Sequence, residues 1–79
     1  MNEKQAAIIK ELKINVLELD SAMGSYYFPL TNNYLIHKEI RIDINGLLHF
    51  HSYEAGLKNS YVQITKEKAI KLIKLKNFE

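Results

Sequence analysis

Two runs of alternating apolar and polar residues meet at Asp43-Ile44-Asn45-Gly46, and this junction constrains the fold more than any other segment of the chain. The Asp43 side chain can accept hydrogen bonds from the backbone that follows it, and Gly46 adopts a positive φ at no steric cost. The junction therefore predicts a β-hairpin. We expect a three-residue loop closed by a glycine bulge, with Asp43 opposite Leu47.

The length of this loop decides which side chains share a face, because a slip of one residue moves every side chain of a strand to the opposite face. The three-residue loop places four apolar residues on one face, which we expect to be buried: Ile40, Ile42, Leu48 and Phe50. The other face then carries Glu39, Arg41, Asp43, His49 and His51, and we expect Arg41, His49 and His51 to be exposed. A two-residue loop would place both histidines among the isoleucines, which separates polar from apolar residues less well.

The N-terminal segment has an apolar stripe at helical spacing, formed by Ile8, Ile9, Leu12, Val16, Leu19 and Met23. Asn2 and Gln5 have the spacing of a capping box, and Gly24 is a typical helix stop, so we predict a helix from Asn2 to Ala22. A second apolar strip on that helix, Ala7, Ile14 and Leu17, would stay in water unless a second copy covered it. This strip favours a homodimer. In the alternative, the helix ends near Lys13 and residues 14–19 form a strand, with Ile14 inside.

The rest of the chain predicts a single domain over residues 1–79. The three consecutive aromatic residues before Pro29 favour a loop or an edge segment, and residues 34–43 and 47–53 are the strands of the hairpin. Residues 55–59 are a turn, residues 61–64 a third strand, and Thr65 caps a helix over residues 66–76. We therefore predict the α+β class, as a two-layer α-β-β-β-α fold with a three-stranded antiparallel sheet packed on two helices.

This order of elements, with a lysine-rich last helix, resembles the double-stranded-RNA-binding fold and the small toxin proteins built on it. The local motifs of those proteins differ from this chain. Tyr61-Val62-Gln63-Ile64-Thr65 stands where the RNA-binding members have a Gly-x-Gly-x-Ser segment, and Gly24-Ser25 is followed by Tyr26 where the toxins have histidine. The resemblance therefore concerns only the element order and the lysine-rich last helix.

Composition narrows the function classes. The 79 residues include no cysteine, which excludes disulfides and thiolate metal sites. No apolar run approaches the ~20 residues of a membrane span, and the first five residues lack the features of a secretory signal, so we expect a cytoplasmic protein with no membrane partner. The net charge of +2 is too small to indicate nucleic acid by itself.

The histidines of the hairpin are the first candidate for chemistry. His49 and His51 point the same way from one strand, and with Glu39, and with His37 on the same face, they have the residue types of a metal or acid–base site. Against this, Arg41 opposite His49 would repel a cation, and a flat hairpin offers little concavity. We therefore assign no catalytic residue, metal or cofactor. A small histidine- or metal-dependent nuclease stays an alternative.

The C-terminal lysines are the second candidate. Lys68, Lys71 and Lys74 advance by three residues and form one ridge on a helix, which can meet phosphates. Lysines near a helix C-terminus are also favoured by the helix dipole, as a solvated face. A nucleic-acid-binding domain that uses this ridge is an alternative function.

Tyrosines supply the third candidate, because they offer large, stiff contact areas that anchor protein interfaces. We predict a protein-binding surface that consists of Tyr26, Tyr27, Arg41, His49, His51 and Tyr53. The sequence thus favours a small non-catalytic protein-binding module, such as a phage or mobile-element inhibitor or adaptor that acts on a host protein complex.

Overall fold

The computed structural model describes residues 1–31, 35–54 and 60–77, and it has the predicted α+β class with more strands than expected. The helices are α1 (Glu3–Leu12), the short 3₁₀ helix η1 (Val16–Glu18) and α2 (Lys66–Asn77). The strands are β1 (Asp20–Ala22), β2 (Ser25–Pro29), β3 (Ile36–Ile42), β4 (Leu48–Glu54) and β5 (Ser60–Ile64). The predicted turn over residues 55–59 lies outside the described residues.

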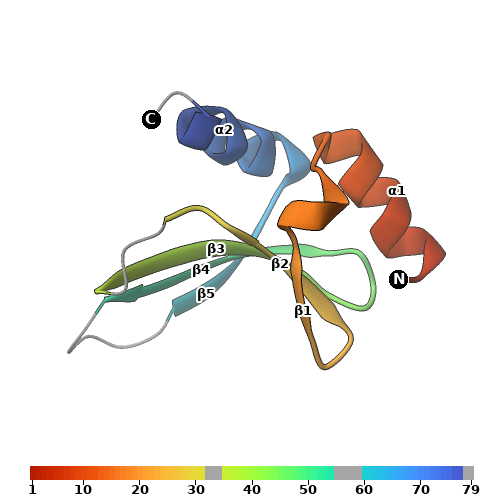
Figure 1. The fold of residues 1–79 in the computed structure, drawn as a ribbon, viewed down its shortest axis with the longest axis horizontal. Helices are drawn as coiled ribbons and strands as arrows, with labels where there is room; N and C mark the ends of the chain where they lie inside the picture. Colours follow the sequence, from red (N-terminus) through yellow and green to blue (C-terminus); the bar gives the residue numbers. More distant parts are fainter. Residues whose placement is uncertain (32–34, 55–59, 78–79) are drawn as a thin grey trace.

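The five strands form one antiparallel meander in the order β1-β2-β3-β4-β5, so the expectation of three strands is wrong. The α-β-β-β-α order, and with it the resemblance in element order, does not hold. Both α1 and α2 lie on the same side of the sheet, as predicted (Figure 1). Between these layers lies the buried core: Ile9, Leu12, Ile14, Phe28, Ile40, Ile42, Leu48, Ala69 and Ile73. Neither helix covers the opposite face, which we call the open face.

The β3–β4 hairpin has the predicted loop and register. The backbone N–H of Asp43 donates to the Leu47 carbonyl oxygen at 3.0 Å, the N–H of Gly46 donates to the Asp43 carbonyl oxygen at 2.9 Å, and Gly46 has φ 77°. Ile42 stands opposite Leu48, and both are buried. Phe50 stands opposite the buried Ile40 but is itself only half-buried, because it lines a shallow surface hollow beside α2.

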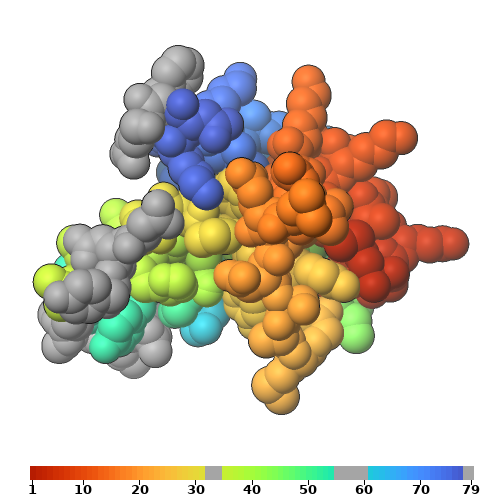
Figure 2. Space-filling view, viewed as in Figure 1, coloured from red at the N-terminus to blue at the C-terminus, as the bar shows by residue number. Residues whose placement is uncertain are grey.

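The first helix ends ten residues earlier than predicted, at Leu12. Lys13 takes a left-handed conformation with φ 57°, and its N–H bonds to the carbonyl oxygens of Ile9 and Lys10. Asn15 then caps η1 by accepting the N–H of Leu17 at 3.0 Å, a local bond that competes with continued helix. Figure 2 shows the segment after α1, in orange, filling the space between α1 and α2 on this side of the molecule.

This early helix end removes the strip on which we based the homodimer. Ile14 is 8% exposed and belongs to the core, as the alternative reading of residues 14–19 expected, although those residues form η1 and not a strand. Leu17 lies on η1 and is 91% exposed, while Ala7 lies on α1. Because the three residues do not share one helix and Ile14 is inaccessible to a second copy, the predicted interface of Ala7, Ile14 and Leu17 is wrong.

The aromatic run forms an inner strand, not the loop or edge segment that we expected. Tyr27 pairs with Asp20 of β1 on one side and with Arg41 of β3 on the other. Strand β1 exists because Met23 and Gly24, with φ 51° and 83°, both adopt the left-handed conformation that a tight two-residue hairpin turn needs. Pro29 stands at the last position of β2, where its missing N–H interrupts the ladder least.

The predicted capping box at the start of α1 is present, and its glutamine also ties α1 to two turns of the sheet. The Asn2 and Gln5 side chains each accept a backbone N–H of the other residue. The buried Gln5 amide also donates from Nε2 to the Gly24 carbonyl oxygen at 2.7 Å and to the Asp43 carbonyl oxygen at 3.1 Å. Both turns are therefore fixed relative to the helix layer.

We predict that Gly46→Ala destabilises the fold more than Gly24→Ala. Both residues have a positive φ, which costs a non-glycine residue about 1–2 kcal/mol. A Cβ on Gly46 would also lie 3.0 Å from the Lys4 carbonyl oxygen, whereas a Cβ on Gly24 would meet only the tip of Ile44 at 3.7 Å. Urea unfolding of both variants measures the difference in the free energy of unfolding. Equal losses of stability would show that the backbone of α1 does not lie as close to Gly46 as described.

Candidate functional site

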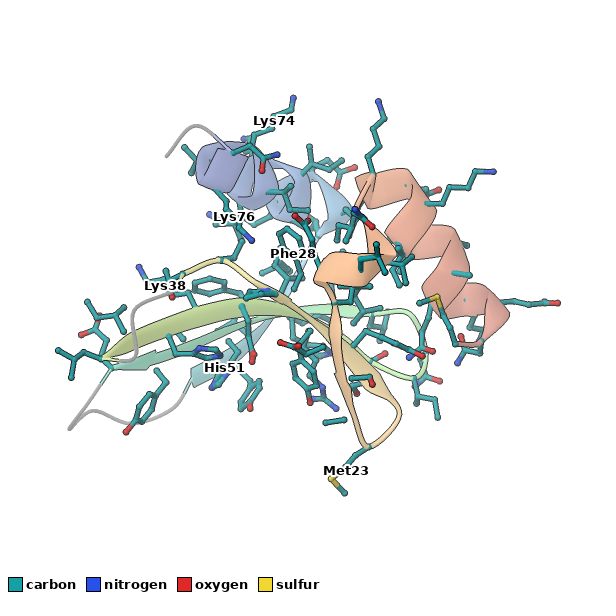
Figure 3. The ribbon with its side chains drawn as sticks, viewed as in Figure 1. Met23, Phe28, Lys38, His51, Lys74 and Lys76 are labelled. Atoms are coloured by element: carbon teal, nitrogen blue, oxygen red, sulfur yellow. The ribbon has the colours of Figure 1, made fainter. Side chains whose placement is uncertain are left out.

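Strand alternation places a continuous polar and aromatic surface on the open face. One row of paired residues crosses the sheet as Tyr27, Arg41, His49 and Gln63. The next row contains Glu39, His51 and Tyr61, and the third contains His37 and Tyr53. Figure 3 shows His51 projecting from the sheet on the side away from both helices.

The open face brings together most of the residues that we predicted for protein binding. Tyr27, Arg41, His49, His51 and Tyr53 share it, because each occupies the same parity of the strand alternation. Tyr26 does not join them. It pairs with Ile42 on the helix side of the sheet, where it packs against the core.

His49 is held by the hairpin loop. Its Nε2 lies 2.9 Å from Oδ2 of Asp43, while Oδ1 of Asp43 accepts the backbone N–H groups of Asn45 at 2.9 Å and Leu47 at 3.0 Å. Partial burial raises the pKa of the Asp43 carboxyl, but the hydrogen bonds from His49, Leu47 and Asn45 and the attraction of His49 outweigh it. The net pKa lies below the ordinary 3.8. The imidazole of His49 therefore helps to hold the Asp43 side chain that closes the loop.

His51 belongs to a separate group, the His37–Glu39–His51 cluster. Nε2 of His37 lies 3.0 Å from both carboxylate oxygens of Glu39, and Nδ1 of His51 lies 3.5 Å from Oε1 of Glu39. The Tyr61 ring stacks on His51 at 4.1 Å between centroids, with 3° between the planes. His51 is consequently 9% exposed, so our expectation that it is exposed is wrong.

Arg41 is half-buried in the middle of the open face, and the His49 side chain is only 20% exposed, so our expectation that these two residues are exposed is also wrong. Its Nε donates to Oγ of Ser25 at 3.3 Å, which draws the guanidinium along β2 toward the β1–β2 turn. Within residues 1–31, 35–54 and 60–77, no carboxylate forms an ion pair with Arg41. Its charge is therefore not neutralised by a described neighbour.

The lysine ridge lies on the other side of the molecule. Lys68, Lys71 and Lys74 are exposed on α2, whose start is capped as predicted by the Thr65 hydroxyl accepting the Lys68 N–H at 3.1 Å. Lys76 differs from them: its Nζ donates to the Pro29 carbonyl oxygen at 2.6 Å and lies 4.3 Å from the centre of the Phe28 ring (Figure 3). The ridge and the tyrosines of the open face thus point to opposite sides.

The sequence placed His37, Glu39 and His51 on one face but did not single them out as a group. Our prediction relied on the His49-x-His51 spacing. In the structure, His49 contacts Asp43, whereas His51 lies with Glu39 and His37. The useful signal was the His37-x-Glu39 spacing on β3 combined with the hairpin register. The stacking of Tyr61 had no such signal, because the register of β5 depends on the segment before it.

No family model, curated protein or solved structure matches this chain. Among the described helices, none has both the length and the apolar character that crossing a membrane requires.

We predict that the Asp43 carboxylate stabilises the fold at neutral pH and loses this effect in acid. Because its pKa is lowered in the folded state, the contribution is present above the unfolded-state pKa and disappears as the pH falls through the folded-state value. Asp43→Asn keeps an acceptor for the loop but lacks the charge. Urea unfolding between about pH 6 and pH 2 should show the wild type more stable than Asp43→Asn at the upper end, with the gap closing toward the lower end. A gap independent of pH would contradict this role.

Proposed function

We propose that this chain is a non-catalytic protein-binding module that docks a partner protein on its open sheet face. The observation that carries the proposal is the shared face of Tyr27, Arg41, Tyr53 and Tyr61, which no described helix covers (Figure 1). Tyrosine and arginine are the residue types that most often dominate the binding energy of protein interfaces.

The exposure of these residues supports the proposal. Tyr61 is 54% exposed and Tyr53 is 37% exposed, although each has an aromatic ring that would gain from burial. Arg41 offers a guanidinium whose Nε is already oriented by Ser25, so little conformational entropy is lost when it meets a carboxylate. A partner surface with a carboxylate opposite Arg41 and apolar area opposite the tyrosines fits this arrangement.

The charges of the open face favour protein over nucleic acid. Asp20, Glu39 and Asp43 all lie on this face or at its border, whereas Arg41 is the permanently charged cation that the described strands place on it. The lysine of β3, Lys38, has the opposite strand parity and lies on the helix side. Phosphates would be repelled by these carboxylates, while nucleic-acid sites are strongly positive. The lysine ridge of α2 remains the alternative surface, for which a nucleic acid would bind on the opposite side of the molecule.

The module that we propose acts as an inhibitor or adaptor on a host protein complex. A preformed sheet face with exposed aromatic residues can occupy a partner surface without chemistry at the site. A cytoplasmic partner is consistent with the absence of cysteine.

Site-specific photocrosslinking tests which surface docks. We expect a photoreactive phenylalanine analogue at Tyr53 or Tyr61 to crosslink the same protein in extracts of the native cell. The analogue at Leu75, which is 63% exposed on α2, should not crosslink it. Arg41→Ala should reduce the yield from Tyr61, because it removes the central charge of the face.

Crosslinks to protein from Leu75 alone, or none from either tyrosine, would contradict the proposal. Capture that disappears after nuclease treatment and after replacement of Lys68, Lys71 and Lys74 by glutamine would favour the alternative function. The Leu75 position serves as the matched control, because its side chain is at least as exposed as either tyrosine.

We still propose self-association, but through the exposed residues of η1 and not through the strip of Ala7, Ile14 and Leu17. Val16 and Leu17 expose apolar side chains on η1, and a second copy could cover them. If it does, sedimentation equilibrium should give a dimer mass for the wild type and a monomer mass for Leu17→Lys. A monomer mass for both proteins would end this part of the proposal.

A further inference from the structure

We propose that His37, Glu39 and His51 form a binding site for one divalent transition-metal ion of the zinc class. These residues lie on the open face, in the rows of Tyr61 and Tyr53, but the inference does not rest on the docking of a partner protein. The three residues offer two imidazole nitrogens and a carboxylate, and their ligand atoms all lie within 4.8 Å of one another.

The distances suit a single ion placed between the three side chains. Two ligand atoms about 2.0–2.2 Å from a zinc ion at a tetrahedral angle lie roughly 3.3–3.6 Å apart. The carboxylate of Glu39 lies 3.0 Å from Nε2 of His37 and 3.5 Å from Nδ1 of His51. The ligand atoms therefore lie near the spacing that one ion requires, and His37, whose side chain is half-exposed, is the ligand that can turn to complete it.

The backbone holds the three ligands in fixed relation. His37 and Glu39 are two residues apart on β3 and so point the same way, and His51 of β4 stands directly opposite Glu39. Both strands are inner strands of the sheet. Stacking with Tyr61 restricts the ring of His51, in the way that surrounding contacts orient metal-ligating histidines.

Electrostatics also favour a cation here. Glu39 is 9% exposed, and a carboxylate that is partly removed from water gains most from a nearby opposite charge. We expected Arg41 to repel a cation from this face. Its bond to Ser25 directs the guanidinium toward the β1–β2 turn, while the cluster lies on the other side of Arg41, in the rows of Pro29 and Tyr53.

The donor set defines the class of ion. Two imidazoles and one carboxylate suit zinc and other divalent first-row metals better than magnesium or calcium, which prefer oxygen ligands alone. The His37 side chain is 41% exposed, so the cluster is open to solvent on that side. Three protein ligands leave a fourth position of a tetrahedral zinc ion for water or another ligand.

Calorimetric titration with Zn²⁺ alone tests the site, and NMR signals of the imidazole rings locate it. We expect the wild type to bind one ion, with the largest ring shifts at His37 and His51. His37→Ala and Glu39→Gln should each weaken binding by more than the roughly 10–100-fold that loss of an outer-sphere partner costs. His49→Gln is the matched control, because His49 lies two residues from His51 but contacts Asp43. The zinc affinity of this variant should equal that of the wild type.

Absence of zinc binding by the folded wild type would overturn the proposal, and the three residues would then be a hydrogen-bonded polar cluster. An affinity unchanged in His37→Ala, or lowered equally in His49→Gln, would also overturn it. Circular dichroism without metal checks the fold of each variant. If Glu39→Gln does not fold, His37→Ala decides alone, because its half-exposed side chain contributes least to packing.

Discussion

Asp43 holds the β3–β4 loop through both its side chain and its backbone. Its carboxylate binds the N–H groups of Asn45 and Leu47 and the imidazole of His49, and its carbonyl oxygen accepts the N–H of Gly46 and the amide of Gln5. One residue thus closes the loop, fixes its length at three and connects it to α1. Because loop length sets the register of a hairpin, Asp43 determines the face on which every side chain of β3 and β4 lies.

This register gives the sheet an apolar face toward the helices and a polar, aromatic open face. Ile40, Ile42 and Leu48 meet the helices and form the centre of the core. On the open face, the same register sets Glu39 opposite His51, and Arg41 opposite His49. A shift of one residue would bury the charged groups and expose the isoleucines. The proposed docking surface and the proposed metal site are therefore both consequences of the loop, although each is tested separately.

Features that depend on residues close together in the chain, such as helix caps and the hairpin turn, were predictable from the sequence. Features that depend on contacts between distant residues were not. The Asn2–Gln5 capping box, the Thr65 cap and the β3–β4 register each depend on residues close together in the chain. The end of α1 at Leu12 depends on a left-handed lysine, which has no intrinsic preference for that conformation, and on the gain from burying Ile14. The burial of His51 requires Tyr61 of β5, whose pairing the hairpin alone does not determine.

Cross-strand nuclear Overhauser effects between Hα protons report whether a three-residue loop sets the register of the β3–β4 hairpin. In an antiparallel hairpin these protons approach closely in pairs that are not hydrogen-bonded to each other. With Asp43 bonded to Leu47, we expect strong Hα–Hα signals between Ile42 and Leu48 and between Ile40 and Phe50. Signals between Asp43 and Leu48 and between Arg41 and Phe50 would instead show a two-residue loop, and the register described above would be wrong.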